Sequence, residues 1–418
     1  MKIIIHTMYF LPDSGSAPIL MNELAAFLAS RGHDVEVITT IPRPPYHQDY
    51  RWRLFQKEQS NGFLVKRYRT NLTAHHIGRL AAWMIYTKWT ILNLLTVRRG
   101  DVLFLRLPPL QLGITGYLAK KLKGAGVLLS VQDIHPDLSI ESGLLRNPRA
   151  ISMAQKFEKW VYKKADEIVV ISEGFQKNLE AKGVSSGKLN IVPNWVDTEF
   201  LKPLPKGNPL AEKYSLTDKF VIMYSGTISI SSIMTLEKIL ESAKLLKGDK
   251  DTLFVIVGEG LKKAELGKKA RELDLANVLF LPFQPYEDLP QLLASSDVLL
   301  VPLDKEKSHL SVPSKLYNFM AAGRPILGLT DDESEVAHII KAADCGLNAD
   351  PEDIKKIVGQ IRTLKESPER CKSLGKNARD HAVKHYAKDK VLREYEEIIK
   401  NIGLCHARSG SDEAIPFI

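Results

Sequence analysis

The sequence predicts an α/β protein made of two Rossmann-like, doubly wound domains with parallel sheets. Short apolar strands alternate with amphipathic helical segments along most of the chain, and strands separated by helices are typical of parallel sheets. The alternation is interrupted once, by the Pro- and Lys-rich stretch FLKPLPKGNP at 200–209. A length of 418 residues also fits two domains better than one.

In the first half, each predicted strand has period-2 or continuous apolar character, and each helix ends near a glycine or a polar turn. The basic stretch between the second and fourth strands is the least regular part. The predicted strands are 2–10, 34–40, 63–70, 101–107, 126–133, 167–172 and 189–194, and the predicted helices are 19–32, 117–122, 154–165 and 172–183. These elements predict an N-terminal domain over 1–198, followed by a linker over 199–217.

The second half repeats the pattern and predicts a C-terminal domain over 218–385. Its elements follow one another with short turns, as expected for strand–helix units. The predicted strands are 219–226, 252–260, 278–283, 297–303 and 325–329, and the predicted helices are 235–246, 261–274, 287–296 and one beginning near Pro313. Residues 404–418 show no periodicity and read as a loose tail.

The net charge of +9 is concentrated in the N-terminal half. Between Arg51 and Arg99 the chain has many Lys and Arg residues and a single acid, Glu58. Large aliphatic residues and tryptophans dominate the centre of this stretch, which favours an anionic membrane surface as partner over nucleic acid. A spanning helix is disfavoured by Lys88 at its centre, and a buried core helix stays an alternative.

The start of the chain reads as a buried strand, not a signal peptide. The three cysteines, Cys345, Cys371 and Cys405, lie far apart and form neither a metal pattern nor a disulfide framework. Both observations favour a reducing cytoplasm, and with the basic segment they predict a protein on the inner face of the cell membrane.

The stretch SVPSKLYNFMAAGRPILG at 311–328 is the most informative about function. Pro313 suits the first turn of a helix that starts at the carboxyl edge of a parallel sheet, where α/β proteins bind ligands. Ser314 and Lys315 place a hydroxyl and a positive charge at that end, and Asn318 shares their face one turn on. This layout predicts a site for a nucleotide-diphosphate donor, although an ordinary strand–helix unit has the same pattern.

These residues resemble the donor signature of the family 4 retaining glycosyltransferases, which have the glycosyltransferase-B fold of two Rossmann-like domains facing a cleft. The resemblance is greatest to the bacterial branch that builds O-antigen, colanic acid and capsule. It implies that a helix over 386–403 crosses back to the N-terminal domain. The family carries two glutamates eight residues apart, which align here with Leu310 and Asn318. The resemblance therefore gives Asn318 the ribose contact and leaves His309 as a substitute for the first glutamate.

Further motifs match the family's donor site in type and position. Each has a plain structural alternative, because glycine turns, helix caps and core aromatics produce the same local patterns. The resemblance assigns the diphosphate to glycine loops and nearby lysines, and the nucleobase to the segment FLPFQPYEDL at 280–289. The candidate residues are Gly15, Gly226, Thr227, Gly258, Glu259, Lys262, Lys263, Phe283 and Gln284.

The loop VQDIHPD at 131–137 supplies the acceptor-side candidates, Asp133 and His135. In the branch that this loop resembles, Asp133 accepts a hydrogen bond from the acceptor hydroxyl; as an alternative it caps the next helix. The sequence shows no cluster of residues with metal-ligand spacing, so neither a metal nor another cofactor is expected. Transfer would depend on positioning and charge stabilisation.

Together, the residues and the resemblance predict a retaining, nucleotide-sugar-dependent glycosyltransferase of cell-surface polysaccharide biosynthesis. Its donor would be a nucleotide-diphosphate-sugar and its acceptor a lipid-diphosphate-linked saccharide. Two alternatives remain: transfer to a soluble acceptor, and an inactive partner subunit that only binds nucleotide-sugar. The second is motivated by the missing glutamate at Leu310.

Overall fold

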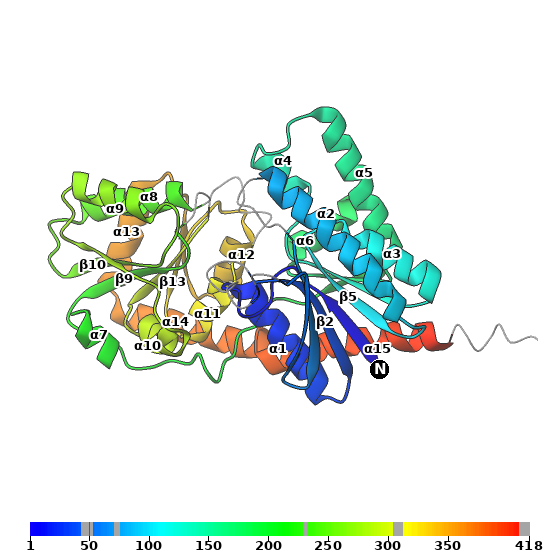
Figure 1. Cartoon of the computed structure of the whole chain (residues 1–418). Coiled ribbons are helices and arrows are strands. Elements are labelled where there is room, and N and C mark those ends of the chain that lie inside the picture. The colour runs from blue at the N-terminus through cyan, green and yellow to red at the C-terminus, as the bar shows by residue number, and fades with distance from the viewer. Residues whose placement is uncertain (43–49, 51–52, 71–75, 229–231, 304–311, 409–418) are drawn as a thin grey trace, which may run out of the picture. The chain divides into compact units, whose positions relative to one another are not determined.

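A computed structural model describes residues 1–42, 50, 53–70, 76–228, 232–303 and 312–408 (Figure 1). The chain forms two compact units: Met1–Pro193 together with Val391–Ile418, and Asn194–Lys390. Each unit is a mainly parallel sheet covered by helices, so the predicted fold class of two α/β domains is confirmed.

Unit 1 contains an eight-stranded sheet in the order β3-β4-β2-β1-β5-β6-β7-β8. All neighbouring strands are parallel except β3 and β4, which form an antiparallel hairpin. The sequence reading missed β3, although Asn61 and Gly62 between these strands have φ of 45° and 84° and form the dipeptide typical of tight hairpins. The strands are β1 (Lys2–His6), β2 (Asp34–Thr40), β3 (Phe55–Ser60), β4 (Phe63–Tyr68), β5 (Val102–Leu107), β6 (Gly126–Val131), β7 (Glu167–Val170) and β8 (Leu189–Ile191).

Helices cover both faces of this sheet. A Cβ on Gly116 of α3 would meet Leu105, whereas a Cβ on Gly403 of α15 would meet Val102; these β5 residues point to opposite faces. Figure 1 shows α2, α3 and α5 on one face and α1 and α15 on the other. The helical elements are α1 (Ser16–Ser30), α2 (His76–Leu92), η2 (Asn93–Thr96), α3 (Leu112–Lys123), α4 (Asp137–Glu141), α5 (Pro148–Lys164), α6 (Glu173–Ala181), η3 (Ser186–Lys188) and α15 (Lys388–Arg408).

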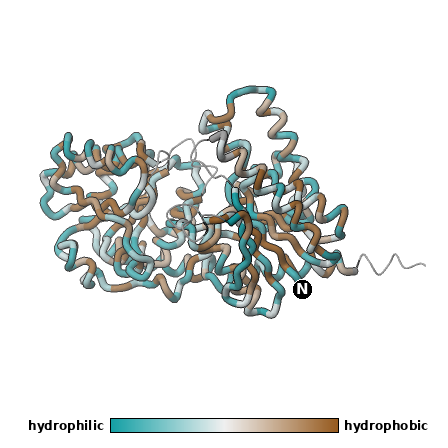
Figure 2. Tube along the Cα trace, viewed as in Figure 1, coloured by the Kyte–Doolittle hydropathy of each residue, from teal (hydrophilic) through white to brown (hydrophobic). Residues whose placement is uncertain are grey.

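Unit 2 contains a six-stranded, fully parallel sheet in the order β11-β10-β9-β12-β13-β14. Figure 2 shows hydrophobic residues concentrated along the strands and polar residues on the outer surfaces. The strands are β9 (Phe220–Ser225), β10 (Thr252–Val257), β11 (Val278–Leu281), β12 (Val298–Pro302), β13 (Ile326–Leu329) and β14 (Gly346–Ala349).

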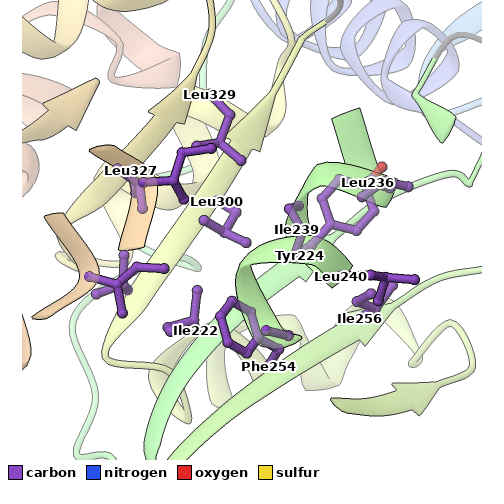
Figure 3. Close-up of a cluster of buried hydrophobic side chains, with 14 of the residues drawn as sticks. Ile222, Tyr224, Leu236, Ile239, Leu240, Phe254, Ile256, Leu300, Leu327 and Leu329 are labelled. Atoms are coloured by element: carbon purple, nitrogen blue, oxygen red, sulfur yellow. The ribbon is translucent and has the colours of Figure 1, made fainter. Parts of the chain in front are cut away.

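The core of unit 2 lies between this sheet and the helices on each side. Figure 3 shows strand residues such as Ile222 and Phe254 packed against Leu236, Ile239 and Leu240 of α8. Burial of such side chains contributes about 25 cal/mol per Å² and holds the strand ends in place. The helical elements are α7 (Pro209–Lys213), α8 (Ile233–Leu245), α9 (Lys263–Glu272), η4 (Tyr286–Asp288), α10 (Leu289–Ala294), α11 (Lys315–Ala321), α12 (Glu335–Ala342), α13 (Ile354–Lys365) and α14 (Pro368–His385).

Three boundaries differ from those predicted. The units divide at Pro193 and Lys390 instead of at 198 and 385. The stretch 199–217 is part of unit 2 and contains α7, because Asn208 caps this helix and Pro209 opens it. Residues 404–408 continue α15, and the predicted tail therefore begins later.

Candidate active site

The donor-side candidates of unit 2 gather where β9, β10 and β11 end. Parallel pairing of Ser225 with Val257, and of Val257 with Leu281, brings the three following loops to one edge. The loops continue the ladder, since Gly226 N donates to Val257 O at 3.0 Å and Gly258 N donates to Leu281 O at 3.0 Å. The carboxyl edge of a parallel sheet is where α/β proteins bind ligands.

The glycines at this edge allow the first two loops to touch. Gly258 has φ of 156°, and a Cβ there would lie 2.0 Å from the carbonyl oxygen of Gly226. Gly260 has φ of 152°, and its Cβ would lie 2.2 Å from Ile228 O. Only glycine fits both positions, so the G-x-G pattern reflects a close backbone approach.

Lys315 lies against this pair of loops. Its Nζ sits 4.1 Å from the centroid of the Tyr224 ring, and a Cβ on Gly226 would be 2.7 Å from the same nitrogen. No described carboxylate pairs with it, and burial lowers the pKa of Lys315 to about 7. The site thus holds a desolvated amine that gains stability when an anion arrives.

Tyr224 anchors the arrangement and was not among the predicted site residues. The ring is buried, and its hydroxyl donates to Thr227 O at 2.8 Å, which fixes the turn after β9. Burial raises the pKa of Tyr224 to about 12, and its ring lies beside the Lys315 ammonium group at cation–π distance. Nothing in the strand sequence FVIMYS distinguishes this tyrosine from an ordinary core residue.

The other predicted lysines are already paired. Lys262 forms an ion pair with Glu265, and Lys263 pairs with Glu259 at 2.6 Å. The partners of each pair are three or four residues apart, and their side chains are partly exposed to solvent. Each ion pair therefore contributes only a fraction of a kcal/mol to stability. Lys315 is therefore the better placed cation for a diphosphate.

The base-binding candidates also reach this edge. Phe283 follows β11 and is 50% exposed, which leaves its ring available for stacking. Gln284 donates from Nε2 to Pro282 O at 2.9 Å and accepts from the Tyr214 hydroxyl at 3.4 Å. These bonds hold the loop without using the ring of Phe283.

Helix α11 begins at Lys315, with Ser314 as its N-cap. Pro313 therefore precedes the helix instead of standing in its first turn, which corrects the sequence prediction. The Ser314 hydroxyl makes no capping bond. Asn318 lies one turn on, partly buried, with its backbone in the helix. His309 lies outside the described residues.

Gly15 belongs to unit 1, where it is the N-cap of α1 with φ of 116°. A Cβ there would meet nothing within 4 Å. The glycine is needed for its backbone conformation, not for close packing, and it leaves open space at the N-terminus of a fifteen-residue helix.

Asp133 and His135 follow β6, also in unit 1. Burial raises the pKa of Asp133, and the nearby charges of His135 and Arg106 oppose this. His135 lies 3.0 Å from Ser139 Oγ through Nδ1, and its ring meets Trp83 of α2 edge-on at 6.0 Å. The carboxylate makes no capping bond to α4, whose first residue is Asp137.

Arg106 on β5 was not predicted as a site residue. Burial lowers its pKa, and its Nε is buried without a partner among the described residues. The sequence could have indicated a site here, because Arg106 is a single charged residue in the otherwise apolar strand VLFLRL, and buried charges are rarely left without a partner. After His135, Arg106 provides a second positive charge that favours the ionised form of Asp133.

Within the described ranges, no group of three or more His, Cys, Asp or Glu side chains is arranged to hold a metal ion. The same ranges contain no helix that is both long and apolar enough to cross a bilayer.

Comparison with known proteins identifies the family of each unit. Residues 15–195 match the "Glycosyl transferase 4-like domain" and residues 211–381 match "Glycosyl transferases group 1". The chain is 27% identical to WcaI of Escherichia coli K12, named for colanic acid biosynthesis, over 94% of this chain and 98% of that protein. It is 28% identical to the Pseudomonas aeruginosa glycosyltransferase WbjE over 64% of this chain and 67% of that protein.

Solved structures show the same fold. Anabaena HepE in complex with UDP-glucose has a TM-score of 0.70 at 16% identity, over 96% of this chain and 100% of that chain. At this identity the likeness establishes the architecture alone. The family matches in both units, which together span most of the chain, show that it belongs to the family 4 glycosyltransferases, and the solved structures show the glycosyltransferase-B fold.

Proposed function

We propose that the protein transfers a sugar, with retention of configuration, from a nucleotide-diphosphate-sugar to a lipid-diphosphate-linked saccharide. The observation that carries the proposal is the desolvated amine of Lys315 beside Gly226 and Tyr224. A diphosphate placed there would pair with the ammonium group beside the glycine loops. The UDP-glucose complex of HepE supports a donor of this class.

The acceptor side of the proposal rests on Asp133. Burial raises the pKa of this carboxyl group, and the charges of His135 and Arg106 partly oppose the effect and favour the ionised form. A carboxylate in this state can accept a hydrogen bond from a sugar hydroxyl and orient it. In retaining transfer of this type the leaving diphosphate takes the acceptor proton, so the protein has to position the hydroxyl, and no metal or other cofactor is required.

Membrane attachment is proposed from α2 and η2. One stripe of these helices exposes Leu80, Met84, Leu92 and Leu95, with Lys88 as the charged residue among them. The opposite face is buried, with Ala82 and Tyr86 fully covered. An amphipathic helix of this kind lies in the membrane interface, which supports docking on the cytoplasmic leaflet.

The overall proposal is tested by supplying a panel of labelled nucleotide-sugars to the protein with bacterial membranes. Label should enter the fraction extracted by organic solvent. Label found only in water-soluble oligosaccharide would favour the soluble-acceptor alternative. Saturable nucleotide-sugar binding without any transfer would favour the inactive-partner alternative.

We expect Asn318→Leu to weaken nucleotide binding and Asn318→Glu to preserve or improve it. An amide or carboxylate can bond a ribose hydroxyl, whereas leucine would leave that hydroxyl unpaired, at a cost of about 1–3 kcal/mol. Calorimetry with UDP, GDP and ADP measures the difference. Equal affinity of the Leu variant and the wild type would remove Asn318 from the donor site.

We expect Arg98→Glu combined with Arg99→Glu to reduce binding to anionic vesicles. Each Lys or Arg near an anionic surface contributes about 1 kcal/mol to binding. Reversing two such charges should therefore lower the affinity for the vesicles several-fold or more. Both residues are exposed just beyond η2. Vesicle sedimentation at low and high salt measures the effect. Nucleotide affinity should not change, because the donor residues belong to the other unit.

A further inference from the structure

We propose that unit 2 contains a second anion site, which takes a small phosphate monoester. A cavity of about 500 Å³ opens at the start of β9, before β12 and at the turn between α11 and β13. Phe220, Asp297 and Pro325 mark these three points. They lie at the amino edge of the sheet, whereas Gly226 and Gly258 follow its carboxyl edge, so the cavity is separate from the donor site.

The wall of this cavity is strongly cationic. Two of its positive charges are balanced, because Lys365 pairs with Asp249 at 2.6 Å and Lys376 pairs with Asp380. The single lining carboxylate, Asp297, is itself paired with Lys206. The charged lining residues are Asp297, Arg324, Lys365, Lys372, Lys376 and Arg379.

Three cations in the wall form no ion pair with a carboxylate among the described residues, although Asp297 acts on Arg324, and Glu199 and Asp380 act on Arg379, at longer range. Arg379 donates to the neutral carbonyls of Thr198, Leu201 and Ala321, and Arg324 donates through NH2 to Leu204 O and Ala294 O. Carbonyl bonds position a guanidinium group but do not neutralise it. Lys372 is exposed on α14. The cavity therefore has a positive charge that a dianion would balance.

One donor of Arg324 is also unused. Its Nε is buried and has no hydrogen-bond partner in the part of the chain that the structure describes. An unpaired buried N–H of a charged group costs free energy, so the protein itself does not fully satisfy this guanidinium group. Burial also lowers the pKa of Arg324, because the guanidinium group has lost part of its hydration.

The residues that line the cavity favour a ligand whose phosphate is attached to an apolar group. Lys372, Lys376 and Arg379 lie on one face of α14, at intervals of four and three residues. Between them Gly375 brings α14 close to α11, since a Cβ there would lie 2.4 Å from Gly323 O. The remaining wall is apolar, formed by Phe220, Leu364, Pro203, Pro325 and Pro368. A monoester would place its phosphate on the cations and its organic group on this wall.

The test uses thermal shift with phenyl phosphate and inorganic phosphate at constant ionic strength, in a Lys315→Ala background that weakens the donor site. Phenyl phosphate should raise the melting temperature saturably and bind more tightly than inorganic phosphate. Lys372→Glu should weaken this binding at least fivefold. Lys268→Glu is the matched control, because Lys268 is exposed on α9 of the same unit and should not affect it.

Three results would overturn the proposal. The first is the absence of saturable stabilisation by phenyl phosphate. The second is an equal effect of Lys372→Glu and Lys268→Glu, which would indicate nonspecific charge attraction. The third is equal affinity for the two probes, which would show that the apolar wall makes no contact. Failure of the proposed transfer reaction would not affect these outcomes, since no donor or acceptor is present in the assay.

Discussion

Lys315→Ala is expected to weaken nucleoside-diphosphate binding about 10- to 150-fold. This corresponds to about 1.5–3 kcal/mol, the range for hydrogen bonds to charged groups. The amine is held between the Tyr224 ring and the Gly226 backbone, and burial lowers its pKa to about 7. Because burial has already removed part of the hydration of the lysine, a diphosphate pairs with it at a smaller cost in lost hydration. Calorimetry with UDP and GDP at pH 6.5 measures the loss.

Lys268→Ala provides the control for this variant. Lys268 is a largely exposed lysine of unit 2 that pairs with Glu272 at 3.5 Å. Its removal should leave nucleotide affinity within twofold. An unchanged affinity of a well-folded Lys315→Ala protein would mean that the diphosphate binds elsewhere, and the proposed donor site would then be wrong.

Asp133→Asn is expected to lower kcat/KM for sugar transfer by about 10- to 150-fold, while donor affinity stays unchanged. The change removes the negative charge that orients the acceptor hydroxyl but keeps the size of the side chain. Since burial raises the pKa of Asp133, activity of the wild type should fall on acidification at a higher pH than for an ordinary carboxyl group. Lowering the pH protonates the carboxylate of Asp133, and the protonated form is a weaker acceptor for the hydrogen bond from the acceptor hydroxyl.

The control for the acceptor variant is Asp34→Asn, which removes an exposed carboxylate at the first residue of β2 in the same unit. Transfer rates should be unaffected. If Asp133→Asn retained at least half of the wild-type kcat/KM, Asp133 would be a structural residue of the loop after β6, and the acceptor side of the account would need another group.

Much of the fold could be predicted, because the strand–helix alternation depends on local periodicity. The strands containing Ile222 and Phe254 are apolar without interruption, as buried parallel strands should be. The β3–β4 hairpin was missed because its first strand, FQKEQS, is polar and lies at a sheet edge with alternate residues exposed. The end of α15 was missed because residues 404–408 lack a clear apolar face, although they continue the helix.

The candidate site could be predicted only in part. Lys315 was found because its position at a helix start follows from the sequence, but its contact with the ring of Tyr224, a neighbour from a distant strand, does not follow from it. Glu265 lies three residues after Lys262, a spacing at which helical side chains form ion pairs. This ion pair leaves Lys262 less available to bind the diphosphate. The link between Arg106 and Asp133 depends on strand order, which periodicity alone does not determine.

The measurement that tests the donor site most directly is proton uptake on binding of UDP at pH 8, by calorimetry in buffers with different ionisation enthalpies. At this pH the phosphates of the nucleotide are fully ionised. With its pKa at about 7, most of Lys315 is neutral in the free protein, and pairing with the diphosphate raises that pKa. The account predicts uptake of close to one proton, and an affinity that falls by up to about tenfold per pH unit above pH 7. Lys315→Ala should abolish the uptake. Tight binding of UDP without proton uptake at pH 8 would contradict the account.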